Sequence, residues 1–257
     1  MKSNLLEVVN LSKIFKQHSR MPTIALNSAS LFVDHGEIVG LLGQNGAGKT
    51  TLLKCISGLV SPTYGQIILD GADVSGDLRQ VSQKVSILVE GNRNIYWRLS
   101  PEENLEFFSG IQGLSLRQAR TVIDQLLEIL NLNHKRKVPV RMLSRGMQQK
   151  VSIACTLVRQ TSLLLLDEPT LGVDAQTSIE LSNFLKASAL SHGKGIVISS
   201  HDIAFIENVC DRIIEMQEGR IVTNRILHAS QGNIVSFNYR KFHKEKDCFA
   251  DLSINGG

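Results

Sequence analysis

The stretch Gly43–Thr50, which reads GQNGAGKT, constrains this chain more than any other. Its order of glycine, four residues, glycine, lysine and a hydroxyl residue is the spacing of a phosphate-binding loop. The glycines let the backbone curl so that several N–H groups point inward at phosphate oxygens. Lys49 would bring a compact charge to the β- and γ-phosphates, and Thr50 a hydroxyl to Mg²⁺. The pattern predicts a phosphate site formed by Gly43, Gln44, Asn45, Gly46, Ala47, Gly48, Lys49, Thr50 and Thr51.

The residues on either side of this loop strengthen the prediction. Residues 38–42 form an apolar run typical of a buried strand, and residues 51–56 favour a helix that ends at Gly58. A strand, a glycine loop and a helix N-terminus together make an anion site, because the unpaired N–H groups and the helix dipole face the phosphate. An ordinary glycine-rich turn is the alternative, and this context argues against it.

Composition limits the class of protein. The chain has 257 residues, 42% of them hydrophobic and 20% charged, which suits a globular fold with a sizeable core. A formal net charge of +4 is too small to argue for a nucleic-acid partner. The four cysteines are far apart, which argues against a disulfide framework or a zinc site. No segment approaches the roughly 18 apolar residues of a spanning helix, so we expect any work at a membrane to need a partner.

The rest of the chain predicts an α/β fold with a helical insertion. We expect an opening strand over 4–11, a polar loop that lasts through Pro22 and a second strand over 25–33. From about 91 to 160 the pattern is largely helical; Ser100, with proline next and Glu103 three residues on, is a strong helix start. Strands return at 163–166 and 195–200. They are followed by a helical stretch over 203–210, a hairpin over 212–222 that turns at Glu218-Gly219, and a polar, basic tail from about 231.

Two further sites for phosphate chemistry follow buried strands. Asp167 and Glu168 end a run of four leucines, where Asp167 would hold Mg²⁺ or its water. Glu168 would then act as general base or position the attacking water. His201 follows the strand over 195–200, at the edge where α/β sheets gather ligand chemistry. By themselves the two acids could form a solvated turn, and a lone histidine is more often structural.

The order of these motifs resembles the nucleotide-binding domain of ABC (ATP-binding cassette) transporters over about residues 4–230. The sequence Leu143-Ser144-Arg145-Gly146-Met147 is similar to the signature motif of that family, usually leucine-serine-glycine-glycine-glutamine. The resemblance implies an α/β fold: a P-loop NTPase core with a mixed sheet, an N-terminal antiparallel β subdomain and an inserted helical signature subdomain at about 91–160. Residues 231–257 would form a polar, basic C-terminal tail.

The resemblance also implies an ATPase that uses ATP and Mg²⁺ and works as a head-to-tail dimer, homomeric or heteromeric. In this dimer Ser144 and Gly146 would contact ATP held by the glycine loop of a second nucleotide-binding subunit. Ser144 can also cap a helix while its hydroxyl faces phosphate. The remaining positions that match family motifs are Phe15, which stacks on adenine; Glu90, near Mg²⁺; Asp174, in the loop across the dimer interface; and His201, at the γ-phosphate.

Three positions depart from the family pattern. Arg145 replaces a glycine and Met147 replaces the signature glutamine, while Glu90 stands where a glutamine is usual. The first two changes affect the contacts of those side chains but leave Ser144 and Gly146 in place. Glu90 adds a negative charge near Mg²⁺, which would alter metal affinity or coupling.

The stretch from Glu90 to Leu105 is similar to the ABC-2 branch of drug and antibiotic exporters. We therefore expect a peripheral subunit on the cytoplasmic face of the membrane. It would power a separate transmembrane permease that exports a drug, antibiotic, lipid or polysaccharide. One alternative is a soluble ABC ATPase acting in translation or DNA repair, although no nucleic acid is expected because paired cassettes, heptads and cysteine pairs are lacking. Another is an importer ATPase, which shares every catalytic residue.

Overall fold

The computed structural model describes residues 4–17, 20–89, 95–227 and 235–236. Within these residues the larger sheet has seven strands in the order β11-β10-β9-β3-β8-β7-β6, and the smaller has four in the order β2-β1-β4-β5. The larger sheet is formed by β3 (Ile38–Leu42), β6 (Val85–Leu88), β7 (Leu163–Asp167), β8 (Gly195–Ser199), β9 (Arg212–Gln217), β10 (Arg220–Ile226) and β11 (Val235–Ser236). The smaller is formed by β1 (Leu6–Gln17), β2 (Arg20–Val33), β4 (Tyr64–Leu69) and β5 (Ala72–Asp73).

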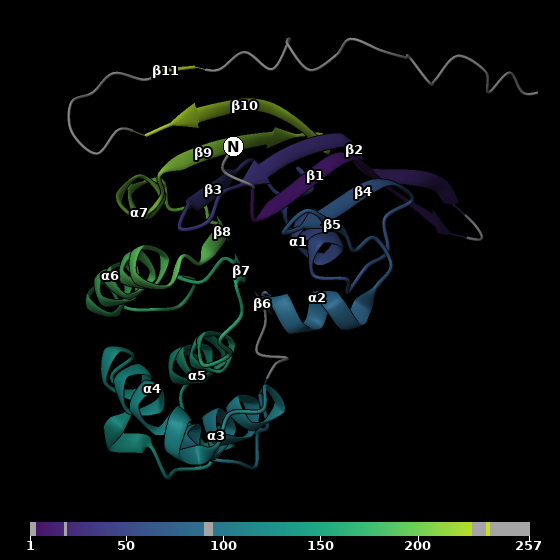
Figure 1. Ribbon diagram of the computed structural model, residues 1–257. Coiled ribbons are helices and arrows are strands. Elements are labelled where there is room, and N and C mark those ends of the chain that lie inside the picture. The colour runs from purple at the N-terminus through teal and green to yellow at the C-terminus, as the bar shows by residue number, and fades with distance from the viewer. Residues whose placement is uncertain (1–3, 18–19, 90–94, 228–234, 237–257) are drawn as a thin grey trace, which may run out of the picture.

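The helices divide into a group around the larger sheet and a group at one end of the molecule (Figure 1). The first comprises α1 (Lys49–Ile56), α2 (Leu78–Lys84), α6 (Ala175–His192) and α7 (Ile203–Val209). The second comprises α3 (Pro101–Ile111), α4 (Leu116–Ile129) and α5 (Arg145–Leu157), with the short 3-10 helices η1 (Asn133–Lys135) and η2 (Val140–Met142). This group follows β6 in the chain and precedes β7, as an inserted helical lobe should. The boundaries at 91 and 160 stay a prediction.

The larger sheet is mixed, as predicted. Strands β6, β7, β8, β3 and β9 pair in parallel, and β10 returns antiparallel to β9. The predicted hairpin at Glu218-Gly219 is confirmed: both residues have positive φ, 49° and 75°, between β9 and β10. The helical stretch predicted over 203–210 is confirmed as α7. Ser100 forms the predicted capping box with Glu103 at the start of α3.

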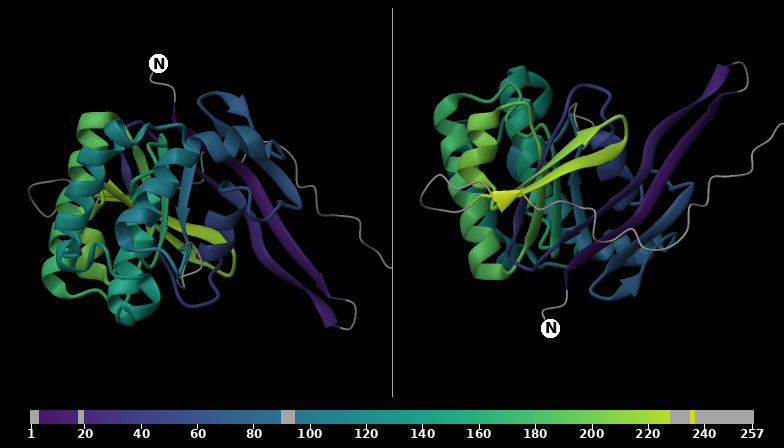
Figure 2. Two further views of the ribbon diagram at one scale, coloured as in Figure 1. Left: turned by 90° about the horizontal axis from the view of Figure 1, so that it is seen from below. Right: turned by 90° about the horizontal axis from the view of Figure 1, so that it is seen from above.

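The predicted polar loop through Pro22 is wrong. Instead β1 continues to Gln17 and β2 begins at Arg20, and the two strands form a long hairpin that extends from the body (Figure 2). Ile14 pairs with Ile24 and Phe15 with Thr23 across this hairpin. Cross-strand pairing of this kind outweighs the local polar pattern on which the prediction depended.

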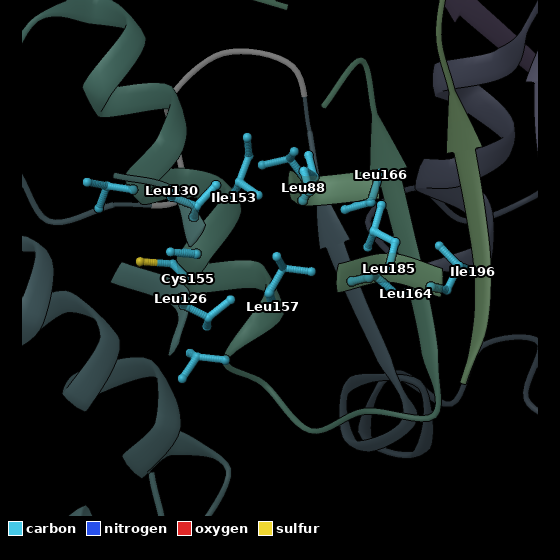
Figure 3. Close-up of a cluster of buried hydrophobic side chains, with 14 of the residues drawn as sticks. Leu88, Leu126, Leu130, Ile153, Cys155, Leu157, Leu164, Leu166, Leu185 and Ile196 are labelled. Carbon is cyan, nitrogen blue, oxygen red and sulfur yellow. The ribbon is translucent and has the colours of Figure 1, made fainter. Parts of the chain in front are cut away.

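Two apolar clusters cover the two faces of the larger sheet. The leucines of β7 alternate between them: Leu163 and Leu165 pack with α1 and the smaller sheet, while Leu164 and Leu166 pack with the helical side. Figure 3 shows part of the helical cluster, which contains Leu126 of α4, Ile153 of α5 and Leu185 of α6 together with Leu164 and Leu166 of β7. All four leucines are at most 4% exposed. Burial on both faces explains why β7 is a continuous apolar run, and it fixes the position of Asp167 at its end.

Candidate active site

The glycine loop joins β3 to α1 with the curled backbone that the sequence predicts. Gly48 caps α1 with φ of 104°, and an added Cβ would lie 2.7 Å from the carbonyl oxygen of Ala25. A side chain there would be both strained and too close, so glycine is required. Lys49 is 7% exposed, and its ammonium donates hydrogen bonds to the carbonyl oxygens of Gly43 at 2.5 Å and Gln44 at 3.2 Å. The charge is therefore held inside the loop.

Asp167 lies at the end of β7, beside the first turn of α1. Its Oδ2 accepts a hydrogen bond from the Thr50 hydroxyl at 2.8 Å, and its Oδ1 accepts one from the Ser199 hydroxyl at 2.6 Å. Asp167 is 2% exposed. A buried carboxylate needs such partners, because burial without them is costly. Both of its oxygens are thus fixed in direction toward the loop and toward β8.

Glu168 and His201 face each other across the ends of two neighbouring strands. Nε2 of His201 lies 3.1 Å from Oε1 of Glu168, and the His201 amide donates to Oε2 at 3.2 Å. Glu168 has φ of 50°, unusual for a residue with a side chain, and its amide donates to the Ser199 carbonyl oxygen at 3.0 Å. Oε1 is buried and, apart from this contact with His201, forms no hydrogen bond within the described residues. A carboxylate oxygen with one such contact has a second lone pair, which can accept from a water.

A pocket of ≈ 160 Å³ gathers most of the predicted residues in one place. The acids of β7 and the histidine after β8 meet the glycine loop here, although they are far apart in the chain. The pocket is lined by Ala25, Asn45, Gly46, Ala47, Gly48, Lys49, Thr50, Thr51, Asp167, Glu168 and His201. It therefore combines the glycine loop at the start of α1, a lysine charge, two carboxylates and a histidine.

Several predicted residues do not line this pocket. Phe15 lies on β1, 40% exposed, with the Lys13 ammonium 5.0 Å from its ring centre. Ser144 and Gly146 begin α5, and Asp174 caps α6 with its carboxylate bonded to Lys150 at 2.7 Å. Glu90 lies outside the described residues. The roles of these residues stay predictions.

The start of α5 explains one departure from the family pattern. Ser144 caps the helix as predicted: its hydroxyl accepts from the Met147 amide at 3.3 Å. Met147 is partly buried and packs against the helical apolar cluster, where a thioether fits better than an amide. Gln148, buried, donates to the carbonyl oxygens of Val140 and Leu143 and so holds the preceding loop against the helix. Arg145 is exposed.

Sequence reasoning missed two residues at the site. Ser199 bonds both Asp167 and the Glu168 amide, at 2.6 and 3.2 Å, and so joins β7 to β8 at the pocket. Its place at the end of an apolar strand, two residues before His201, was the available signal. Ala25 lines the pocket through its approach to Gly48, which only the packing of β2 on α1 reveals.

This fold and this pocket define a phosphate-loop nucleoside triphosphatase. Residues 26–171 match the ABC transporter family. The chain is 38% identical over 206 residues to the Nod factor export ATP-binding protein I of Burkholderia orbicola (strain AU 1054), covering 80% of this chain and 67% of that protein. It is 30% identical over 220 residues to the methionine import ATP-binding protein MetN of Corynebacterium efficiens, covering 84% and 61%.

A solved structure agrees in fold. The dimeric ATP-binding cassette MJ0796, bound to ADP and phosphate in a post-hydrolysis state, superposes with a TM-score of 0.79 at 26% identity, covering 88% of this chain and 100% of that one. The chain therefore belongs to the ATP-binding components of the ABC transporter family, as its sequence motifs predict. It is an ATPase whose hydrolysis of ATP is coupled to transport.

Proposed function

We propose that this subunit dimerises on ATP, hydrolyses it with Mg²⁺ at Glu168 and drives a separate transmembrane exporter. One observation carries the proposal. Lys49, Thr50, Asp167, Glu168 and His201 stand at a single pocket, whereas the Ser144–Gly146 turn lies on the lobe and lines no part of it. The pocket is thus half of a site, and a second subunit would bring its own signature turn to complete it.

The residues fit a magnesium ion. Thr50 Oγ1 and Asp167 Oδ2 are 2.8 Å apart, close to the ~2.9 Å that separates adjacent oxygens of an octahedron with Mg²⁺–O distances of about 2.0–2.1 Å. Within the described residues no cluster of three or more His, Cys, Asp or Glu side chains could hold a metal alone. That suits an ion completed by phosphate and water. When bound, it would neutralise charge that develops between the β- and γ-phosphates.

The chain's own groups divide the chemistry among them. The loop N–H groups and Lys49 would hold the β- and γ-phosphates, so that the terminal phosphorus is presented to Glu168. Glu168 would accept a proton from the attacking water or orient it, because its buried Oε1, which contacts His201, can also accept from that water. His201, 54% exposed and 3.1 Å from that oxygen, would orient Glu168 and reach the γ-phosphate from the open side.

An exposed aromatic cluster supports a protein partner on the lobe. Tyr96, Trp97 and Phe107 are 48%, 44% and 41% exposed, and the rings of Tyr96 and Phe107 lie 4.7 Å apart. Buried Asn104 holds the Tyr96 backbone in place, because its side-chain oxygen accepts from the Tyr96 N–H and its side-chain nitrogen donates to the Tyr96 carbonyl oxygen. Beside it is a groove of ≈ 450 Å³ lined by Leu59, Ile87, Ile95, Tyr96, Phe108, Cys155, Thr156 and Arg159. Aromatic residues around a groove are typical of binding surfaces.

We assign this surface to a cytoplasmic segment of the transmembrane protein. None of the helices in the described part of the chain is long and apolar enough to cross a membrane. A peripheral position on the cytoplasmic face would follow from such a contact. Export is favoured by the relative that carries Nod factor export in its name, and import by the relative named for methionine import. The direction is tested by identifying the membrane protein that co-purifies and the movement of its substrate.

Glu168→Gln tests the ATPase proposal most directly. The change keeps the size of the side chain and one acceptor oxygen but removes the base, so ATP binding should persist while turnover falls by at least about a hundredfold. Dimers should accumulate with ATP and be seen by sedimentation. Unchanged turnover in this variant would contradict the role of Glu168, and an absence of dimers with bound ATP would contradict the two-subunit site.

A further inference from the structure

Lys150 is a buried lysine that the ATPase chemistry described above does not use. It lies in the second turn of α5, 8% exposed, and its ammonium contacts Asp174 Oδ2 at 2.7 Å and Thr177 Oγ1 at 2.8 Å. Asp174 and Thr177 belong to the start of α6, not to the helical lobe. Thr177 is 2% exposed, and its backbone amide and its hydroxyl each donate a hydrogen bond to the Asp174 carboxylate. The three side chains form a closed network, which holds its members more firmly than one bond would.

A second contact joins the same two segments one turn nearer to the signature serine. Gly146 precedes Lys150 by four residues, so the two lie on one face of α5. A Cβ added to Gly146 would be 3.0 Å from the carbonyl oxygen of Gly172. The backbone of α5 is therefore packed closely against the loop that leads into α6. Two points of attachment on one helix face fix orientation as well as distance.

That loop begins at the acid of the ATP pocket. Leu171 donates its amide to the Glu168 carbonyl at 3.2 Å, and Val173 donates to the Thr170 carbonyl at 3.1 Å. These consecutive turns make the chain from Glu168 to Asp174 compact. A short path therefore leads from Ser144 along α5 to Lys150, across the ion pair to Asp174, and back along the loop to Glu168.

We propose that Lys150 is a positioning residue that fixes the signature turn of a subunit to its own catalytic loop. The inference rests on the proposed two-subunit site. Ser144 serves the ATP of the partner, whereas Glu168 serves the ATP of its own subunit. Lys150 and Asp174 hold the signature turn and the Glu168 loop of one subunit together as a rigid unit. ATP bound to the partner therefore orients Ser144 directly and, through this unit, orients Glu168 at the ATP site of the same subunit as Ser144. The ion pair thus couples the two sites.

The test compares variants in the Glu168→Gln background, where dimers persist. Lys150→Met keeps the bulk of the buried side chain and removes its charge; Lys150→Arg keeps the charge. We expect Lys150→Met to raise the dissociation constant of the ATP-bound dimer about tenfold, within the usual range of coupling between sites. Lys150→Arg should dimerise nearly as tightly as the parent. Lys186→Met, at a half-buried α6 lysine whose ammonium donates to Asn208, is the matched control and should leave the dissociation constant of the dimer unchanged.

Binding of ATP to the monomer separates this role from a general loss of structure. At protein concentrations too low for dimers to form, the dissociation constant of Lys150→Met for ATP should be within about twofold of that of the parent, because the pocket does not include Lys150. In the active protein the same change should lower kcat with little change in KM. Asp174→Asn removes the other charge at a side chain 57% exposed, so it remains informative if Lys150→Met does not fold. The double variant should be no weaker than either single variant.

The outcomes are distinct. Dimers of Lys150→Met that are as tight as the parent, with unchanged kcat, would overturn the coupling role while leaving the two-subunit site intact. Failure of Glu168→Gln itself to dimerise with ATP would overturn the two-subunit site, and this inference with it. Weaker dimers, normal monomer binding and rescue by Lys150→Arg would establish the inference.

Discussion

The hydroxyl of Thr50 donates a hydrogen bond to Asp167 at 2.8 Å, joining two residues 117 positions apart in the chain. The bond ties the first turn of α1 to the end of β7. It brings the glycine loop and the carboxylate edge of the sheet together without any ligand. The oxygen atoms proposed for Mg²⁺ are therefore preorganised, which lowers the cost of binding the ion with ATP.

Loss of the Lys49 charge should remove most ATP binding. Lys49→Ala leaves the loop carbonyls of Gly43 and Gln44 without their donor and the phosphates without a buried cation. A hydrogen bond to a charged group contributes about 1.5–3 kcal/mol, so the dissociation constant for ATP should rise at least ~10- to 100-fold. Titration calorimetry measures it. Lys54→Ala, on the same helix but outside the pocket, should bind ATP normally.

The missed residue Ser199 should matter for turnover more than for binding. Ser199→Ala removes the donor to Asp167 Oδ1 and the second acceptor of the Glu168 amide. An unsatisfied buried acceptor costs about 1–3 kcal/mol, so kcat should fall roughly 10-fold with the ATP dissociation constant nearly unchanged. Steady-state kinetics gives both values. Ser162→Ala, just before β7 at its opposite end, is the control; an equal loss there would point to stability instead.

The aromatic cluster on the lobe should affect the partner and not the chemistry. Phe107→Ala removes a 41% exposed ring that packs on Tyr96 and Phe108, and aromatic residues dominate binding energy at interfaces. Co-purification with the transmembrane protein should weaken by tenfold or more, while ATPase activity of the isolated subunit stays within about twofold. Leu190→Ala, at a more exposed apolar residue on α6, should leave the complex intact. Retained assembly in Phe107→Ala would move the contact elsewhere.

Acid should weaken the contact between α5 and α6. The ammonium of Lys150, with the amide of Thr177, holds the pKa of Asp174 well below its ordinary value. Because the pKa is lowered on folding, the stabilisation is present above the unfolded pKa of about 3.9 and is lost as pH falls further. Thermal unfolding between pH 7 and pH 3 should show wild type losing stability below about pH 4. The Asp174→Asn variant should be less stable than wild type at pH 7 and should lose less stability between pH 7 and pH 3. If the stability of both proteins fell in parallel with pH, the ion pair would be contradicted.

The local elements of this protein could be predicted because their signals are short. The glycine loop between β3 and α1, the capping box of Ser100 with Glu103 and the turn at Glu218-Gly219 all depend on residues a few positions apart. The motif order then indicated the ABC transporter family, and comparison with known proteins confirmed it. The two strands that form the hairpin of β1 and β2 were predicted too short, because pairs such as Phe15 with Thr23 depend on the partner strand.

The amino-acid sequence by itself determined the phosphate loop, the acids at the end of β7 and the histidine after β8. Only the tertiary structure decided how they meet, because the strand order β9-β3-β8-β7 is not the order of the chain. Parallel pairing of these strands aligns their carboxyl ends at one edge, where Thr50, Asp167 and His201 line one pocket. The roles assigned to Ser199 and Lys150 could be inferred only from the tertiary structure. Their partners, Asp167 and Asp174, are fixed by packing between distant segments and not by any local pattern.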